Sequence, residues 1–545
     1  MARSLPSMFL TILLVAFLGE VVRRRRHGLA AILRTLPPAS RALRAEVRAA
    51  IGRVATWEWA GLAAVTALAV LLRLRHLGQP IRYDEAATWL DYASQPLGHA
   101  LSDYRFPNNH LLHTLLVHMS AAVFGSAPWA LRLPALVAGI ALVPLTWAIG
   151  RALYSPAPAL GAAGIAAAST TLVLFSTNAR GYTILACLTV MLALLAVWQV
   201  RLDNVAGWVA MAVVAALGAW TIPIMLYPAT GIGLWLWLEA RAGGAAIDAR
   251  TMRSRLAQTG LAALCLTMVL YLPVVARTGI ALVVGNRFVL PQSRADFFAQ
   301  LPGFIAGVGQ DYTRGWNDSL AVLLGVALVA ALVGWRRVGR HRVSMLGAML
   351  AAAMLLLVAN GRLPYFRVWM YLLPFVLAGS AAGLDWLVRL TIGRSAPRAA
   401  PLVTAVLLAA VVVVASVSMT RRNAVERADD TGTLRDGAAI ASFLAGSARA
   451  RDRVIASAPT DLPLAYHLRL SGNSDLLRAT PDSAQRLWIV VNVGAGQQER
   501  ALVEGAEIVT KDFGAPTLVR RFAEASVFVR RRERPGCVLD PSVCR

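Results

Sequence analysis

Two adjacent carboxylates, Asp84 and Glu85, follow Arg82 and Tyr83 in the segment IRYDEAATWL, shortly after an apolar run at 59–76. Acidic residues are scarce in this chain, which has 29 Asp and Glu against 54 Lys and Arg. Ionisable groups at membrane depth are costly and usually functional, whereas groups at the rim of the membrane are less costly. The pair therefore suits a general base or a metal ligand at a membrane-facing cleft. The alternative is an ordinary solvated pair in a loop.

A second group of polar residues follows in the stretch YRFPNNHLLHTLLVHM. The spacing of apolar residues over 108–124 predicts an amphipathic helix in the outer membrane interface. Asn108, Asn109 and His110 at its start are candidate substrate ligands. His110 and His113 share one helix face and could hold a metal, but an interfacial histidine pair more often makes structural hydrogen bonds.

Three arginines stand where apolar runs begin or end. Arg180 lies in STNARGYTIL, and Arg362 and Arg367 lie in NGRLPYFRVWMYLLP. Guanidinium groups at such boundaries either extend toward the interface or bind an anion, and their planar paired donors suit a phosphate. Tyr365, with Trp369 and Tyr371, could instead belong to an aromatic belt at the membrane interface.

The elements that position these residues are membrane-spanning helices. The chain is 57% hydrophobic and 15% charged, whereas soluble domains carry about 25% charged residues. Apolar runs of the length that crosses a bilayer recur along it, and they predict an all-α polytopic membrane protein with about 11–12 transmembrane helices and interfacial helices. The runs are 5–22, 59–76, 129–150, 157–175, 181–199, 206–222, 223–239, 257–275, 319–335, 343–359, 369–390 and 401–419.

The distribution of arginine predicts which side each loop occupies. The net charge of +25 resides mostly in short loops between apolar runs, which is typical of cytoplasmic loops and argues against nucleic-acid binding. With RRRR at 23–26 inside, the loop 77–128 and the tail from 420 lie outside. Residues 23–56 read as a basic amphipathic helix on the inner surface. If residues 206–239 formed one span, the predicted side of every later loop would be reversed.

Three parts follow from this pattern. Residues 1–58 form an anchor and basic segment, 59–419 the transmembrane domain, and 420–545 an extracytoplasmic domain. The tail has strand-like and helix-like stretches, and about 120 residues suffice for a small α/β domain. Cys537 and Cys544, in CVLDPSVC, would form a local disulfide in an oxidising compartment.

The order of five segments resembles a known family. They are RYDEA, NNHLLHTLL, FGSAPWALRLPALVAGI, NARGYTIL and LPYFRVWMYLLP. The chain resembles the GT-C membrane glycosyltransferases, in the branch related to protein O-mannosyltransferases and the lipid A aminoarabinose transferase (glycosyltransferase family 39-like). The resemblance covers about residues 59–390. No single motif establishes this resemblance. It rests on the order of the five segments and on their common predicted side of the membrane.

The resemblance implies a reaction and roles for residues. Such enzymes transfer a sugar from a polyprenyl-phosphate donor outside the cytoplasm. It implies that Asp84 is the general base toward an acceptor hydroxyl, that Glu85 orients the acceptor or Asp84, and that the sugar carbon is inverted. The donor phosphate and lipid would contact Arg180, Arg362, Arg367 and Tyr365, and the substrates would contact Arg82, Tyr83, Asn108, Asn109, His110 and Tyr182.

Departures from the family leave the substrates open. The aminoarabinose branch usually has a Lys-Pro-Pro-type stretch where this chain has PNNHLL, and the protein O-mannosyltransferases have a different domain arrangement. The acceptor is thus a glycan, a lipid or a protein. No metal ligand is assigned, and a divalent cation stays open, with Asp91 and Asp103 as further acidic candidates.

Two other classes of function compete with this interpretation. A transporter or flippase of lipid-linked saccharides would show charges in mid-span and related halves, whereas this sequence has few mid-span charges and no internal repeat. A catalytically silent assembly protein would not need Asp84. We expect a multi-pass protein of the bacterial inner membrane, with polyprenyl-phosphate sugar and membrane lipids as partners and no nucleic acid.

Overall fold

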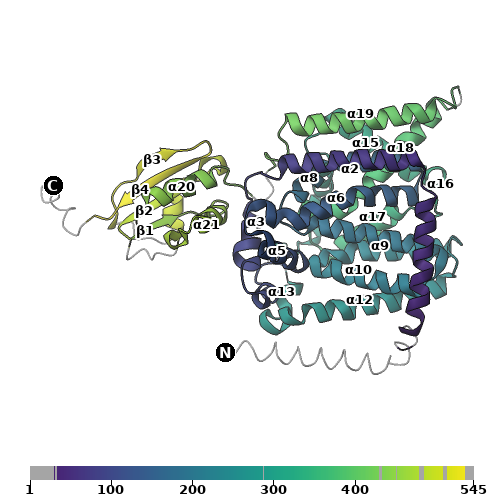
Figure 1. Cartoon of the computed structure of the whole chain (residues 1–545), viewed down its shortest axis with the longest axis horizontal. Helices are drawn as coiled ribbons and strands as arrows, with labels where there is room; N and C mark the ends of the chain where they lie inside the picture. The colour runs from purple at the N-terminus through teal and green to yellow at the C-terminus, as the bar shows by residue number, and fades with distance from the viewer. Residues whose placement is uncertain are drawn as a thin grey trace. The chain divides into compact units, whose positions relative to one another are not determined.

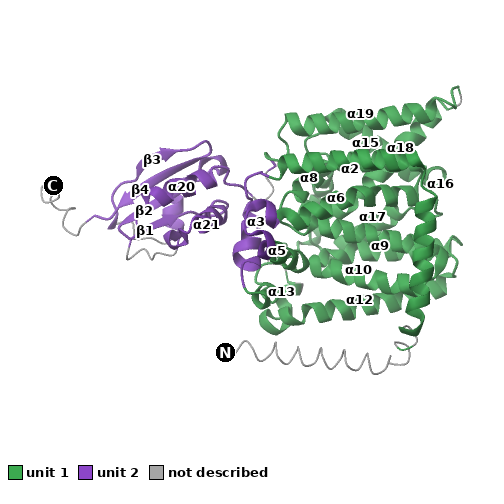
Figure 2. Ribbon diagram, viewed as in Figure 1, with its two compact units in different colours: residues 1–77, 96–120, 132–427 green, residues 78–95, 121–131, 428–545 purple. Residues whose placement is uncertain are grey.

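The structure is a computed structural model. It describes residues 30, 33–285, 288–393, 395–428, 432–449, 451–477, 484–506 and 512–533. The chain divides into two compact units (Figure 2). Unit 1 comprises residues 1–77, 96–120 and 132–427, and unit 2 comprises residues 78–95, 121–131 and 428–545. The predicted anchor at 5–22 and the cysteines Cys537 and Cys544 lie outside the described residues.

Unit 1 is built from helices, most of them long and aligned side by side (Figure 1). A helix over 33–52 comes first. The others, of which α6 begins in unit 2, are α2 (Thr56–His76), α4 (Leu97–Ala100), α5 (Leu111–Phe124), α6 (Pro128–Leu153), α7 (Pro156–Ala167), α8 (Thr170–Ser176), α9 (Tyr182–Leu202), α10 (Val205–Thr221), η2 (Pro223–Met225), α11 (Leu226–Arg241), α12 (Ala249–Thr278), α13 (Ile280–Val284), α14 (Arg294–Tyr312), α15 (Asp318–Val333), α16 (Trp335–Val338), α17 (Met345–Asn360), η3 (Phe366–Leu372), α18 (Leu373–Thr391) and α19 (Ala400–Arg421).

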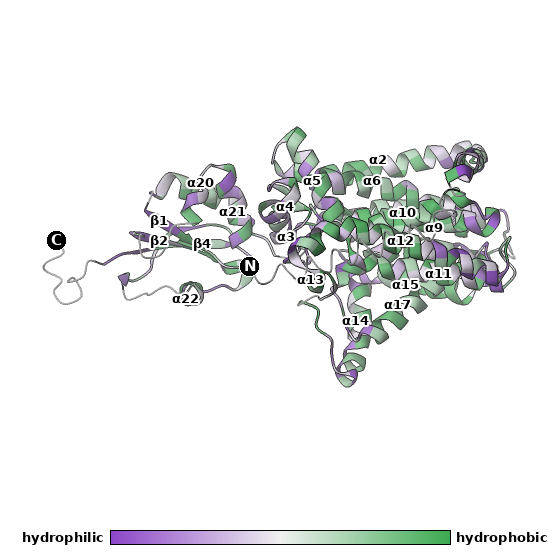
Figure 3. Ribbon diagram, turned by 90° about the horizontal axis from the view of Figure 1, so that it is seen from below, coloured by the Kyte–Doolittle hydropathy of each residue, from purple (hydrophilic) through white to green (hydrophobic). Residues whose placement is uncertain are grey.

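The helices of unit 1 identify a multi-pass membrane protein. Six helical segments of the described chain are long and apolar enough to span a bilayer, and a bent pair would make seven. Further apolar helices of 10–17 residues, including α10, α15 and α17, correspond to other predicted spans. Figure 3 shows apolar residues over most of this unit. The predicted all-α polytopic architecture is confirmed.

The run at 157–175 differs from the single straight span that the sequence predicts. It forms two helices, α7 and α8, which are bent by 58°. Ser169 begins α8 as its N-cap and accepts a hydrogen bond from the amide of Leu172 at 3.5 Å. Apolar composition alone does not reveal this break. The run is apolar on both sides of it, and every residue of α8 is buried. The bend matters because α8 leads into the loop that carries Arg180.

The loop ahead of α5 is tied to α12 by a chain of charged and polar contacts. Arg277 Nη2 lies 2.9 Å from His99 Nδ1, and His99 Nε2 lies 3.2 Å from the Asp103 carboxylate. Arg105 donates to the same carboxylate from its Nε and Nη2 atoms. Burial alone would raise the pKa of Asp103, but the hydrogen bonds and charge of Arg105, with His99, hold it below its usual value.

This network predicts a pH-dependent contribution to stability. Because the folded pKa of Asp103 is depressed, its contribution is present above the unfolded pKa of about 4 and is lost as pH falls through the folded pKa. We expect Asp103→Asn to lower the melting temperature at pH 7 by roughly 2 °C or more. The deficit should shrink below about pH 4. Thermal unfolding in detergent measures it, with Asp475→Asn, an exposed aspartate, as the control; an equal deficit at both pH values would contradict the assignment.

Unit 2 contains a four-stranded sheet in the order β1-β2-β4-β3. β1 and β2 are parallel, and β4 is antiparallel to both β2 and β3. The elements of this unit are α3 (Tyr83–Ala87), η1 (Thr88–Ala93), α20 (Gly437–Ser447), β1 (Asp452–Ile455), α21 (Asp461–Leu470), η4 (Ser474–Leu477), β2 (Arg486–Asn492), η6 (Val493–Ala495), α22 (Glu499–Gly505), β3 (Thr517–Arg521) and β4 (Ala525–Arg531).

The sheet is covered by helices on both faces (Figure 3). Along β2 the side chains alternate, as a strand requires. Trp488 and Val490 pack with the cluster that includes α20 and α21, whereas Leu487 and Ile489 pack with the cluster that includes α22. A strand buried on both faces reads as a continuous apolar run, as RLWIVV does. The predicted small α/β domain near the C-terminus is confirmed.

Candidate functional site

Arg180 lies in the short loop between α8 and α9, and it is almost fully buried, with 3% of its surface exposed. Its Nη1 donates to the backbone carbonyl of Asn108 at 3.2 Å. Its Nη2 approaches His110 Nε2 at 3.4 Å and the Tyr182 hydroxyl at 3.5 Å. The break between α8 and α9 and the start of α5 thus bring four predicted site residues together in unit 1.

Arg367 joins the same group from η3. Its Nε donates to the Tyr182 hydroxyl at 3.0 Å, and its guanidinium lies over the Tyr365 ring at 4.3 Å. Two positive guanidinium groups therefore approach one phenol oxygen in a largely buried place. Like charges repel strongly where water is excluded, and an anion placed between them would relieve that repulsion. We call Arg180, Arg367, Tyr182 and His110 the arginine cluster.

The protonation of His110 adds a donor to the arginine cluster. The backbone N–H of Gly181 donates to His110 Nδ1 at 3.0 Å, so the neutral ring carries its proton on Nε2. Burial and the charge of Arg180 hold the pKa of His110 well below 6.5, which keeps the ring neutral at pH 7. His110 Nε2–H and Arg180 Nη2 then face each other as two donors. One acceptor oxygen, such as that of a phosphate, would satisfy both.

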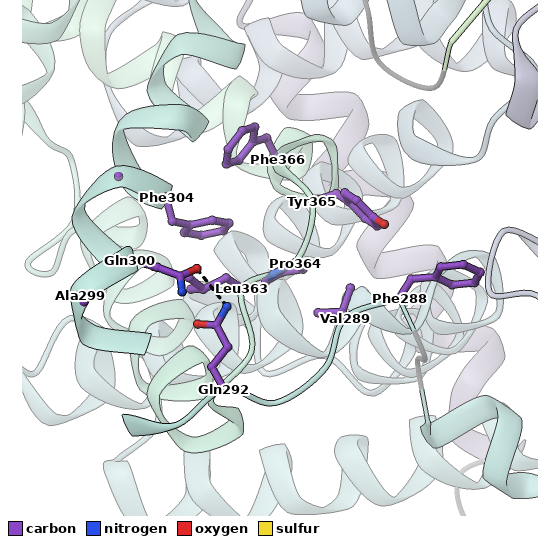
Figure 4. A pocket seen from close by; sticks show the side chains of 11 residues that line it. Phe288, Val289, Gln292, Ala299, Gln300, Phe304, Leu363, Pro364, Tyr365 and Phe366 are labelled. Carbon is purple, nitrogen blue, oxygen red and sulfur yellow. Dashed lines mark hydrogen bonds between the residues drawn. The ribbon is translucent and has the colours of Figure 1, made fainter. Parts of the chain in front are cut away.

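An apolar pocket of about 500 Å³ lies beside the arginine cluster. Tyr365, whose ring stacks on Arg367, is part of its lining. Figure 4 shows Phe304 of α14 and Phe366 on one side, with Phe288 across from them. A pocket with aromatic walls next to the half-buried Arg367 and the buried Arg180 suits a ligand with one anionic end and one hydrocarbon end.

Two predicted site residues of this unit have other surroundings. Arg362 is half-buried and, in the described part of the chain, makes no hydrogen bond to the arginine cluster. Asn109 is 1% exposed and stabilises its own loop. Its amide nitrogen donates to the carbonyls of Ala100 and Asp103 at 2.9 and 2.7 Å, and its oxygen accepts from Thr114. Its amide is therefore committed to the fold.

Two buried polar residues of unit 1 were missed by sequence reasoning. Arg73 of α2 is 0% exposed and donates from Nε to Ser176 Oγ at 3.1 Å. Asn178, also 0% exposed, has no hydrogen-bond partner for either amide atom among the described residues. The signal for Asn178 was its place two residues before Arg180, in the same motif. Arg73 looked like an ordinary arginine at the end of a span.

The acidic pair belongs to unit 2. Asp84 lies in the single helical turn α3 and is half-buried. Glu85 is 1% exposed, and its Oε2 accepts from the backbone N–H of Arg82 at 2.9 Å. A carboxylate that bonds back to the residue before the helix fixes the helix start. Glu85 thus holds the turn that carries Asp84. A π-helical turn, η1, follows directly, a feature frequent at functional sites.

Other acidic groups surround Tyr83. Burial, then Asp461, Asp84 and Asp91, raise the pKa of Tyr83 to about 12. Burial also raises the pKa of Asp461, and its Oδ1 is buried without a hydrogen-bond partner in the described residues. Acidic groups therefore lie around the partly buried Tyr83. In the described ranges, no group of three or more His, Cys, Asp or Glu residues is arranged to hold a metal.

No protein-family model matches this chain, and no curated protein matches it in sequence. Solved structures do match it. ArnT from Cupriavidus metallidurans, bound to undecaprenyl phosphate, has 14% identity and a TM-score of 0.54 over 87% of this chain and 98% of that one. The oligosaccharyltransferase of Archaeoglobus fulgidus has 11% identity and a TM-score of 0.52, over 88% and 74% of the two chains. Both are GT-C proteins.

The chain has the GT-C fold. The similarity extends over both units, because 87% of the chain is covered in the ArnT comparison. A second structure from Archaeoglobus fulgidus, AglB with an inhibitory peptide and a dolichol-phosphate, has 9% identity and a TM-score of 0.50. At identities this low, the structural similarity shows the fold alone, and the chemistry must be argued from the residues. The fold expected from the five sequence segments is confirmed.

Proposed function

We propose that this GT-C chain is a membrane glycosyltransferase that moves a sugar from a polyprenyl-phosphate donor to an acceptor hydroxyl on the extracytoplasmic side of a bacterial inner membrane. The observation that carries the proposal is the arginine cluster beside an apolar pocket. Arg180 and Arg367 reach the same Tyr182 oxygen at 3.5 and 3.0 Å. Tyr365 links the cluster to the pocket.

The donor is bound by unit 1 in this account. Arg180, Arg367 and His110 contact the phosphate, and the pocket lined by Phe304, Phe366 and other apolar residues takes the first isoprene units. As the glycosidic bond breaks, its electron pair moves onto the phosphate oxygen. Fixed positive charges in a dry site stabilise that developing charge without reorganising. This is the contribution we assign to the two arginines.

Asp84 acts on the acceptor in this account. Its carboxylate takes the proton of the acceptor hydroxyl, whose oxygen forms a bond to the anomeric carbon while the bond from that carbon to the phosphate oxygen breaks. Attack opposite the leaving phosphate inverts the anomeric configuration. Glu85, bound to the Arg82 amide, keeps the helical turn of Asp84 in place. The sugar and the acceptor class stay open.

Transfer by proteoliposomes tests this function against transport. Purified protein is reconstituted with polyprenyl-phosphate donors that carry a radiolabelled sugar, and the lipid, glycan and protein fractions of added membrane extract are counted. We expect label to leave the donor and to accumulate in one acceptor fraction. Movement of intact labelled donor between leaflets, with no cleavage, would instead support a transporter and overturn the proposal.

A further inference from the structure

The segment that carries Asp84 is held by residues of the C-terminal domain; Arg82 and Ala428, for example, are 346 positions apart in the chain. The backbone N–H of Tyr83 donates to the carbonyl of Gly432 at 3.1 Å. Next to it, Arg82 and Thr433 form an antiparallel β-bridge. The residue before Asp84 is therefore paired to the strand-like stretch that leads into α20, and not only to its own helix.

The side chain of Arg82 strengthens this attachment. It is 1% exposed. Its Nη1 donates to the carbonyl of Ala428 at 2.6 Å, and its Nε and Nη2 donate to Gln79 Oε1 at 3.3 and 3.0 Å. Burial of a guanidinium is costly unless its donors are well placed. Here the donors of Arg82 connect the segment just before α3 to the start of the C-terminal domain.

Helix α21 of the C-terminal domain makes a second attachment. It packs directly on α3. The hydroxyl of Tyr466, a residue with 0% exposure, donates to the carbonyl of Ser126 at 2.7 Å. One turn later, Arg469 donates to Ser94 Oγ at 3.0 Å. The C-terminal domain thus holds both stretches of the predicted first outer loop that belong to unit 2, 78–95 and 121–131.

We propose that the C-terminal domain of this chain is a positioning element for Asp84, and that Arg82 and Tyr466 are positioning residues for the transfer reaction. The inference rests on the proposed function, in which Asp84 is the base. Misplacing a reacting group by about 1 Å can cost on the order of 100-fold in rate. Donor contacts belong to unit 1, so loss of these attachments lowers kcat and leaves the donor KM unchanged.

Hydrogen exchange and transfer kinetics on the purified full-length protein test the inference together. The variants are Arg82→Gln, Arg82→Lys and Tyr466→Phe. Arg500→Gln is the control, because Arg500 is exposed and pairs with Glu504 within α22. We expect faster exchange of amides 83–93 and a roughly 100-fold lower kcat for Arg82→Gln. Lysine should recover part of the rate, Tyr466→Phe should show a smaller effect, and the control should match the wild type.

The outcomes separate this inference from the proposed function. Asp84→Asn should lower transfer by roughly 100- to 10,000-fold while hydrogen exchange of amides 83–93 stays as in the wild type. If the wild type transfers no sugar, the proposed function is overturned. The positioning of Asp84 for transfer is then overturned as well, whatever the hydrogen exchange shows. If the wild type is active but Arg82→Gln, with an unchanged melting temperature, keeps wild-type exchange and kcat, only the positioning role is overturned.

Discussion

Replacing Asp84 with asparagine is expected to lower sugar transfer by roughly 100- to 10,000-fold, the range that a general base contributes. Asparagine keeps the size of the side chain and removes its ability to take a proton. The backbone carbonyl of Asp84 accepts from Thr88 Oγ1, and this bond does not need the carboxylate. The helical turn should therefore survive, and initial rates at saturating donor measure the effect.

The controls for this substitution come from the same unit. Asp475→Asn changes an exposed aspartate of η4 and should leave the rate unchanged. Glu85→Gln weakens the bond to the Arg82 amide and should lower activity less than Asp84→Asn, with faster exchange of the α3 amides. Transfer that persists in Asp84→Asn, at matched expression, would disprove the role of Asp84 as base.

The second large effect is expected from the arginine cluster. Arg180→Gln and Arg367→Gln each remove a charged donor that we assign to the donor phosphate. Hydrogen bonds to charged groups contribute about 1.5–3 kcal/mol, so each variant should weaken donor binding roughly 10- to 150-fold. Competition by polyprenyl phosphate against a labelled donor measures this affinity directly.

Arg362→Gln is the matched control for this prediction. Arg362 lies five residues before Arg367 but has no hydrogen bond to the arginine cluster in the described chain. Arg362→Gln should weaken donor binding less than about 3-fold, because a partly exposed charge outside the binding contacts contributes little. Tyr182→Phe should fall between the two, because it removes the oxygen that both arginines approach. Equal losses for Arg362 and Arg367 would contradict the assignment of the site.

Much of the fold follows from local sequence signals. Apolar length and loop arginines predict the membrane-spanning bundle, and alternation of sides places Arg180 and Arg367 at corresponding ends of their helices. The helix-like stretches expected in the tail include α20, which forms over Gly437–Ser447. The length and spacing of apolar residues are read within about 20 residues, the range over which hydrophobic periodicity is informative, and the sides then follow from the order of the spans.

The remaining features depend on contacts that no local pattern encodes. The attachment of Tyr83 to Gly432 joins residues far apart in the chain. Asn109 looked like a substrate ligand, but its amide bonds are used within its own loop. The bend between α7 and α8 depends on one serine cap within an apolar run. The same types of polar side chain stabilise loops and bind ligands, so only their hydrogen-bond partners distinguish these two roles.

The central claim is that this protein breaks the bond between a sugar and polyprenyl phosphate with Asp84 as base. The most direct measurement is the release of free polyprenyl phosphate by purified protein, counted against sugar transferred, for the wild type and Asp84→Asn. We expect the wild type to release one polyprenyl phosphate for each sugar transferred, and the variant to release almost none. Transfer without release of polyprenyl phosphate, or equal release by both proteins, would contradict it.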